Sequence, residues 1–422
     1  MPITKLCKVL AQWEDKGGDL ANELYELGNY PIEKHKDAKA ICRTLANPRL
    51  SEPKGKDIIT SPLHAIVGLF QNIKSREGFE ELCTNGLPHL RRFLEQGLEH
   101  ASHDNDDLLF ILKILAMYGQ KEDVDLIIKA ARKPLMQEGY LWSVILGQVD
   151  HEHVGHKSLC DGLREPLPDG FIAMSYLDFA NSLAINGHLD KHPFDSDQGY
   201  ARLEHWLSDP DEKHYALSAT TALPFIQEHK RQRLLQIAAE HPDVAVQMEA
   251  AWAMAKTGLS EGRRYLSNWC LEANYSQKAC LYLEELGIDI PAKCQEPDFQ
   301  AMAEMCNWLA HPNECGYPPD KIELYEKRFL YWPPTEDKRP VWLFKYTYNS
   351  SGDKNEPDIG IAMIGSVTFA LFGEATQSLS PEDVYGLHCC WELEMNQDSR
   401  APKKRTASAG REILCKYNEG FK

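Results

Sequence analysis

Three histidines that lie close together have the clearest potential for metal chemistry. They are His151, His153 and His156, within the segment His151-Glu152-His153-Val154-Gly155-His156. On a helix, His153 and His156 would be i,i+3 neighbours on one face, and imidazole nitrogen is a common ligand of iron and zinc. A polar turn between two helices is the alternative, because Gly155 interrupts the segment. Both a mononuclear metal site and a turn therefore remain open for these residues.

The cysteines indicate free thiols. There are twelve, scattered along the chain, and no C-x-x-C pair occurs. Most occupy apolar helical patterns, where a thiol acts as a small hydrophobic group, so a reducing compartment fits best. One local set, Cys294, Cys306, His311 and Cys315, resembles part of a zinc knuckle but lacks a close cysteine pair. We expect no cofactor, with iron or zinc as the alternative.

A vicinal thiol pair near the C-terminus is a possible nucleophile. Cys389 and Cys390 follow His388, but adjacent helical residues point about 100° apart, so only one thiol could meet a given base. The sequence contains no P-loop, G-x-G-x-x-G, G-x-S-x-G or H-E-x-x-H motif. We expect both thiols to be core residues, and we assign no catalytic residue.

The charge balance favours a basic partner over nucleic acid. The chain has 422 residues, with 46 Lys and Arg against 63 Asp and Glu, and a net charge of -17. Residues 1–330 carry -15 of this charge, which opposes binding to phosphate groups. Solubility alone is the other explanation. No apolar run approaches the roughly 20 residues that span a bilayer, and the N-terminus lacks the apolar core of a signal peptide. We expect a soluble, cytoplasmic protein with neither a membrane nor a nucleic-acid partner.

The elements that position these residues are expected to be repeated helix pairs. The segment 241–258 begins with a Pro-Asp turn, continues with small Ala residues and ends at Gly258. Similar patterns follow Asp209-Pro210-Asp211 and Asn274-Tyr275, and the latter ends at Gly287. The two Pro-Asp turns are 32 residues apart, and the two glycines are 29 apart. Second helices with apolar stripes are expected between them, at 231–240 and 262–271.

This arrangement resembles the HEAT-repeat family, in the short variant also found in phycobilisome-lyase-type proteins. The resemblance covers about 104–290 and implies an α-solenoid of stacked helix pairs. It also implies two enzymatic alternatives, a metal-dependent enzyme or a chromophore lyase. Deoxyhypusine hydroxylases, which are HEAT-repeat enzymes, bind two irons through repeated His-Glu pairs. Here His151-Glu152 is the only His-Glu dipeptide, which departs from that pattern.

The remaining segments complete a mainly α fold with a small C-terminal α/β module. Residues 1–103 are expected to form an N-terminal helical cap, because a solenoid needs an atypical end. Residues 291–332 are expected to be a helical extension and Pro-rich linker, with helices at 296–309 and 320–330. Residues 333–422 should form the α/β module, which resembles no family known to us. Its expected elements are strands at 341–348 and 359–372, a polar turn at 349–358 and a helix at 384–395.

A protein-binding scaffold is the function that these patterns favour. Stacked helix pairs leave a long ridge of exposed side chains, without the deep pocket that catalysis generally requires. The expected partner is a basic protein or peptide, and the oligomeric state stays open. The alternative is a metal-dependent or lyase-type HEAT-repeat enzyme. Five acidic residues are the candidate contacts of the partner: Glu240, Asp243, Glu249, Glu261 and Glu272.

Overall fold

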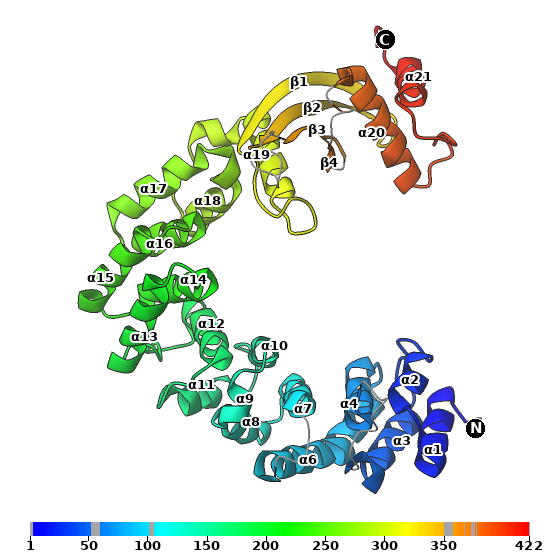
Figure 1. The fold of residues 1–422 in the computed structure, drawn as a ribbon, viewed down its shortest axis with the longest axis vertical. Coiled ribbons are helices and arrows are strands. Elements are labelled where there is room, and N and C mark those ends of the chain that lie inside the picture. The colour runs from blue at the N-terminus through cyan, green and yellow to red at the C-terminus, as the bar shows by residue number, and fades with distance from the viewer. Residues whose placement is uncertain are drawn as a thin grey trace. The chain divides into compact units, whose positions relative to one another are not determined.

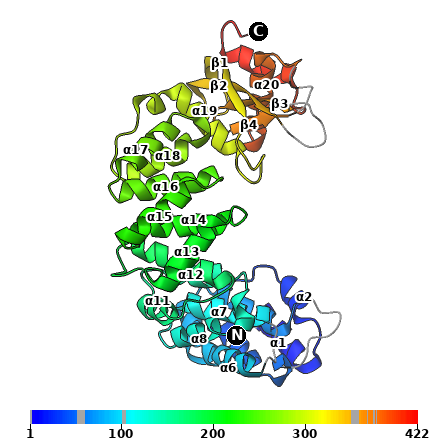
Figure 2. The ribbon, with the colours of Figure 1, turned by 60° about the vertical axis from the view of Figure 1, so that its left-hand side comes forward.

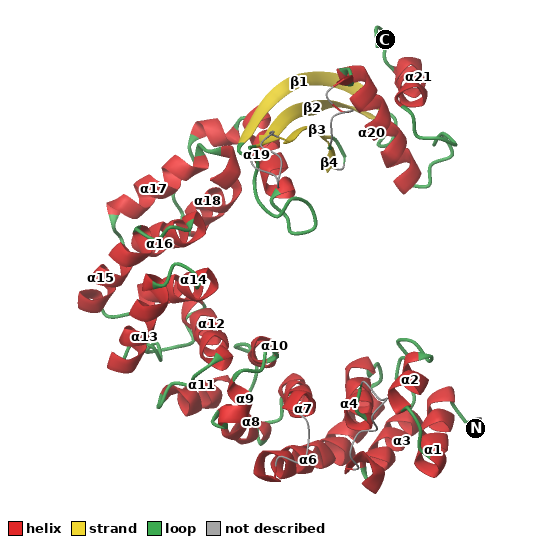
Figure 3. Ribbon diagram, in the orientation of Figure 1, coloured by secondary structure: helices red, strands yellow, loops and turns green. Residues whose placement is uncertain are grey.

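The protein is mainly helical, with a small four-stranded antiparallel sheet near the C-terminus (Figure 3). The computed structural model describes residues 3–51, 60–100, 105–349, 358–366, 368–372, 376 and 378–421. None of the helices in these ranges is both long and apolar enough to cross a membrane. The chain divides into two compact units, residues 1–249 (the N-unit) and residues 250–422 (the C-unit).

Most of the helices expected before residue 290 are present. Those of the N-unit are α1 (Lys5–Lys16), α2 (Leu20–Tyr25), α3 (His35–Leu45), α4 (Pro62–Gly68), α5 (Arg76–Glu81), α6 (Leu87–His100), α7 (Asn105–Tyr118), α8 (Asp123–Ala131), α9 (Pro134–Gln137), α10 (Trp142–Gly147), α11 (His156–Arg164), α12 (Phe171–Ile185), α13 (Asp197–Ser208), α14 (Lys213–Ala222) and α15 (Glu228–Ala239). The unit boundary falls inside α16 (Val244–Lys256). The expected first residue of the repeat region, 104, lies outside the described residues.

Helices of the N-unit that are not consecutive in the chain pack on one another in series. In one series α4 packs on α7, α7 on α10, α10 on α12 and α12 on α14 (Figure 1). In another, α6 packs on α8 and α8 on α11, and further along the chain α13 packs on α15. The hydrophobic faces of α7 and α12 are wide, because each contributes a nearly continuous run of buried side chains. A helix with apolar residues on most sides needs neighbours on most sides.

The glycines expected to end helices do so. Gly258 follows α16 with a φ of 89°, and Gly287 follows α18 (Ala273–Glu285) with a φ of 64°. After Gly258 the backbone N–H of Leu259 donates to the carbonyl of Met254 at 2.9 Å. This bond is the six-to-one contact of a Schellman motif, in which a left-handed residue lets the chain turn away from the helix.

We expect substitution of Ala250 by leucine to destabilise the protein by about 1–3 kcal/mol. Ala250 lies on α16 with no exposed surface, so the added carbons would overpack a filled site. Urea unfolding followed by circular dichroism measures the change. The matched control is Ala201→Leu on α13, where the side chain is exposed and the free energy of unfolding should hardly change. Equal midpoints for the two variants would contradict close packing at Ala250.

The C-unit places helices on both faces of its sheet (Figure 2). Its elements are α17 (Ser260–Cys270), α18, α19 (Pro297–Leu309), β1 (Lys321–Trp332), β2 (Asp337–Tyr348), β3 (Asp358–Ile364), β4 (Thr368–Leu371), α20 (Pro381–Met395) and α21 (Ala407–Tyr417). The strands follow the order β1-β2-β3-β4, and every neighbouring pair is antiparallel. Alternate residues of β2 and β3 point to opposite faces, one packed on α19 and the other on α20 and α21.

Two expectations about the C-unit are wrong. Residues 320–330 were expected to be a helix within a linker, but all except Asp320 belong to β1, which pairs with β2 from end to end with one irregularity between Leu324 and Glu326. The span 359–372 was expected to be one strand, but it contains the β3–β4 hairpin. In β1, pairing with residues of β2 up to 26 positions away overrides the local helical pattern. In 359–372, the apolar run divides into two strands that pair with each other. The expected turn at 349–358 lies mostly outside the described residues.

Candidate functional site

Three of the acidic candidates lie in the N-unit, in different environments. Glu240 is exposed at the C-terminal end of α15. Asp243 is half-buried before α16, where its Oδ1 accepts a hydrogen bond from the N–H of Ala245 at 2.8 Å. Glu249 is not on the surface: its exposed fraction is 8%, and its Oε1 accepts a bond from the hydroxyl of Thr221 at 2.9 Å. The face of α16 that carries Glu249 packs inward, so this carboxylate cannot contact a partner as expected.

The other two acidic candidates lie in the C-unit. Glu261 is exposed in the first turn of α17, and Glu272 is exposed at the residue before α18. Both positions are helix N-termini, where a carboxylate is stabilised by the helix dipole. Their placement is therefore explained by local helix electrostatics, whether or not a partner binds there.

The three candidate metal-binding histidines do not share one helix face: His151 and His153 lie in a turn, and His156 begins a helix, α11. His151 stacks on His188 with ring centroids 4.8 Å apart, and His156 meets the same ring edge-on at 6.0 Å. The Nδ1 of His153 instead accepts a bond from the N–H of Gly155 at 2.9 Å, and burial lowers the pKa of His153. Within the described residues, these histidines do not bring three ligand atoms together.

A pocket lined by aromatic rings lies on the α19 face of the sheet. It has a volume of about 390 Å³. We call it the aromatic pocket and define it by its lining residues, which come from β2, β3 and the segments beside them: Cys315, Tyr317, Tyr346, Tyr348, Asp358, Ile359, Gly360 and Phe372. Tyr346 and Tyr348 are almost fully buried, whereas about half of Tyr317 and Phe372 is exposed. Asp358, the first residue of β3, is exposed.

The rings of the aromatic pocket stand nearly perpendicular to one another. Tyr317 and Tyr348 make an interplanar angle of 78°, Tyr346 and Tyr348 one of 77°, and Tyr346 and Phe372 one of 74°. Two hydrogen bonds hold the inner rings. The hydroxyl of Tyr348 donates to the carbonyl of Tyr317 at 3.0 Å, and that of Tyr346 donates to the carbonyl of Leu371 at 3.1 Å. Burial raises the pKa of both phenols, so both stay protonated donors.

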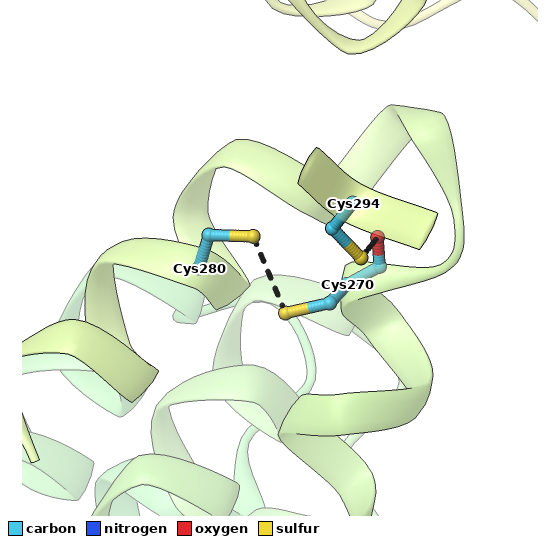
Figure 4. Close-up of side chains that lie close together, drawn as sticks. All are labelled: Cys270, Cys280 and Cys294. Carbon is cyan, nitrogen blue, oxygen red and sulfur yellow. Dashed lines mark hydrogen bonds between the residues drawn. The ribbon is translucent and has the colours of Figure 1, made fainter. Parts of the chain in front are cut away.

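Three thiols form a second group, which we call the thiol cluster (Figure 4). Cys270 is the last residue of α17, Cys280 lies in α18, and Cys294 lies in the short 3-10 helix η5 (Ala292–Gln295). Their Sγ atoms all lie within 4.8 Å of one another. In the part of the chain that the structure describes, no other group of three His, Cys, Asp or Glu side chains offers ligand atoms this close.

Specific contacts hold the thiol cluster. The Cys280 thiol donates to the Sγ of Cys270 at 3.5 Å, and the Cys294 thiol donates to the backbone carbonyl of Cys270 at 2.9 Å. Burial raises the pKa of the Cys270 and Cys294 thiols. Of the local set suggested by the sequence, only Cys294 belongs to the cluster. Cys306 is buried on α19, and Cys315 lines the aromatic pocket.

A buried His–Glu pair lies on the other face of the sheet. His388 and Glu392 of α20 have at most 1% of their side chains exposed, and His388 Nε2 lies 2.6 Å from Glu392 Oε1. The indole N–H of Trp332 donates to the other oxygen of Glu392 at 3.0 Å. Cys389 and Cys390 are buried beside this pair, and burial raises the pKa of both thiols. A raised pKa opposes the thiolate that a nucleophile requires, which agrees with their expected role as core residues.

Sequence reasoning missed the aromatic pocket and the thiol cluster. Tyr317 and Phe372 are separated by 55 positions in the sequence, and Cys270 and Cys294 by 24, with no shared motif. The only available signal was the aromatic pattern of the strand at 341–348, which indicates a strand but not a binding site. Comparisons of the chain with protein-family models, with curated proteins and with solved structures found no match.

Proposed function

We propose that this protein is a non-enzymatic scaffold that binds a basic protein or peptide, and that the aromatic pocket receives a cationic side chain of that partner. The observation that carries the proposal is the pocket's four aromatic rings with Asp358 beside them. Aromatic faces attract ammonium and guanidinium groups, and a nearby carboxylate adds the opposite charge. The volume of about 390 Å³ suits one long side chain rather than a folded surface.

We further propose that residues 104–290 are an α-solenoid of HEAT-like helix pairs that presents an acidic surface to the same partner. The serial packing of non-consecutive helices in the N-unit and the glycine helix ends at Gly258 and Gly287 support this proposal. The net charge of -15 on residues 1–330 would steer a basic partner toward the protein. We propose the cytoplasm as its compartment, since its twelve cysteines are free.

Binding of short peptides tests the role of the aromatic pocket. The probes are peptides of one sequence with a central lysine, trimethyllysine, arginine or uncharged norleucine, titrated by fluorescence anisotropy against the full chain. We expect the cationic peptides to bind at least about tenfold more tightly than the norleucine peptide, because a desolvated cation–π contact contributes about 2 kcal/mol. The double variant Tyr317→Ala/Asp358→Asn should abolish that preference. Equal binding of all four peptides would contradict the proposal.

Two matched variants distinguish a specific role of the aromatic pocket from a general effect of losing an exposed aromatic ring. Phe372→Ala removes a half-exposed ring of the pocket, and Phe329→Ala removes a more exposed ring from β1, which does not line the pocket. Only Phe372→Ala should weaken binding of the lysine peptide. Raising the salt concentration should weaken binding to both the wild type and Phe329→Ala, because exposed charges are screened beyond about 8 Å at physiological ionic strength.

A further inference from the structure

The thiol cluster has the spacing of a metal site. Zinc–sulfur bonds are about 2.3 Å long, so two thiolates on one tetrahedral zinc ion lie about 3.8 Å apart. The Sγ atoms of Cys270 and Cys280 are 3.5 Å apart, and all three Sγ atoms lie within 4.8 Å of one another. Movements of at most about 1 Å would therefore bring the three sulfur atoms to ligand distances.

The cluster also opens onto solvent. A cavity of about 410 Å³ is lined by Cys280 and Cys294, and the carboxylates of Glu284 and Glu304 share its wall. An ion could enter through this cavity. Water or one of these carboxylates would supply a fourth ligand, since zinc accepts oxygen beside sulfur.

We propose that Cys270, Cys280 and Cys294 bind one thiophilic d10 cation, Zn²⁺ or Cu⁺. Three sulfur ligands select these ions over Mg²⁺, Ca²⁺ and Mn²⁺, which prefer oxygen ligands. Binding replaces the thiol protons with the cation, so the protons leave to solvent and affinity rises with pH. No electrons are exchanged in this step.

The bound ion would join three consecutive elements of the C-unit. Cys270 ends α17, Cys280 lies in the middle of α18, and Cys294 precedes α19, which packs on the sheet. Such an ion would be a structural link between the helix pair α17–α18 and the sheet. Its binding does not depend on the proposed basic partner. A ligand that binds only the folded state raises the melting temperature.

Titration of the full chain with Co²⁺ under anaerobic, reducing conditions tests the site. Co²⁺ substitutes for Zn²⁺ and gives thiolate charge-transfer absorption in the near ultraviolet. We expect this absorption to saturate at one ion per chain and to be abolished by added Zn²⁺. The variant Cys280→Ser should weaken Co²⁺ binding by more than about a hundredfold, because loss of an outer-shell partner alone costs up to that factor. The matched control is Cys83→Ser, another half-buried cysteine, which should bind like the wild type.

Two further measurements keep the proposal falsifiable and distinguish the ions. A parallel anaerobic titration with Cu⁺ against a coloured competitor shows which cation binds more tightly, and either result assigns the ion. Zn²⁺ or Cu⁺ should raise the melting temperature of the wild type and of Cys83→Ser, but not that of Cys280→Ser. Absence of thiolate absorption, or equal affinity of Cys280→Ser and the wild type, would overturn the proposal. So would ready formation of a Cys270–Cys280 disulfide when diamide, a two-electron thiol oxidant, is added in saturating Zn²⁺, detected as a loss of two hydrogens by mass spectrometry.

Discussion

Replacing Glu392 with alanine is expected to destabilise the C-unit by about 3–5 kcal/mol. Glu392 is buried between His388 and the indole of Trp332, so its removal leaves two buried polar groups without their partner. Loss of one member of a buried pair costs this much because the remaining group keeps its desolvation penalty. Thermal unfolding followed by near-ultraviolet circular dichroism reports on the packing of the aromatic side chains, Trp332 among them.

Two variants on the same helix calibrate this effect. Glu392→Gln keeps an oxygen that can accept from the indole N–H of Trp332 and should therefore be less destabilising than alanine. Glu394→Ala removes an exposed carboxylate, paired with Arg405 at 3.2 Å, and should cost no more than about 1 kcal/mol. If Glu392→Ala melts at the same temperature as Glu394→Ala, the buried His388–Glu392 pair does not stabilise the packing of α20 on the sheet.

We expect Gly410→Ala to destabilise the same unit by about 3 kcal/mol or more. The backbones of α20 and α21 touch where Gly386 faces Gly410, and a Cβ at Gly410 would collide with the carbonyl group of Gly386. Backbone atoms cannot rotate away as side chains do, so the helices would have to separate. Guanidinium unfolding of the full chain, followed by tryptophan fluorescence, measures the loss.

The control for Gly410 is a glycine with free space around it. Gly147 ends α10, and a Cβ there would meet nothing within 4 Å. Gly147→Ala should leave stability unchanged or raise it slightly, because alanine favours a helix by up to about 1 kcal/mol over glycine. A Gly410→Ala variant as stable as Gly147→Ala would show that α20 and α21 tolerate a wider separation.

Helices were the most predictable elements because their signals are local. The Pro-Asp start of 241–258, and the apolar stripes and closing glycines of 241–258 and 274–287, each lie within a few turns of one another in the chain. The strand at 341–348 was equally evident from its aromatic and β-branched residues. For β1 the same local reading failed, because its register with β2 depends on residues that lie up to 26 positions away.

The candidate functional residues depended still more on distant contacts. Residue type and spacing suggested His151, His153 and His156, yet within the described residues these side chains do not bring three ligand atoms together, and the Nδ1 of His153 instead accepts a bond from the N–H of Gly155. Four of the five acidic candidates lie at or beside helix ends, but which carboxylate is buried depended on the face of α16 that packs inward, as Glu249 shows. Periodicity alone did not identify that face, because small and apolar residues surround α16 on most sides.

The sequence by itself determined the helical class, the glycine-terminated ends of the helices before Gly258 and Gly287, and the acidic character of the chain, since each follows from composition or from residues a few positions apart. Only the tertiary structure decided the aromatic pocket and the thiol cluster. Tyr317 meets Tyr348 because the segment before β1 lies beside the end of β2, and Cys294 meets Cys270 because the chain returns to α17 after α18. Convergence of this kind is set by how hydrophobic faces pack together, a property of the whole unit that no short stretch of sequence contains.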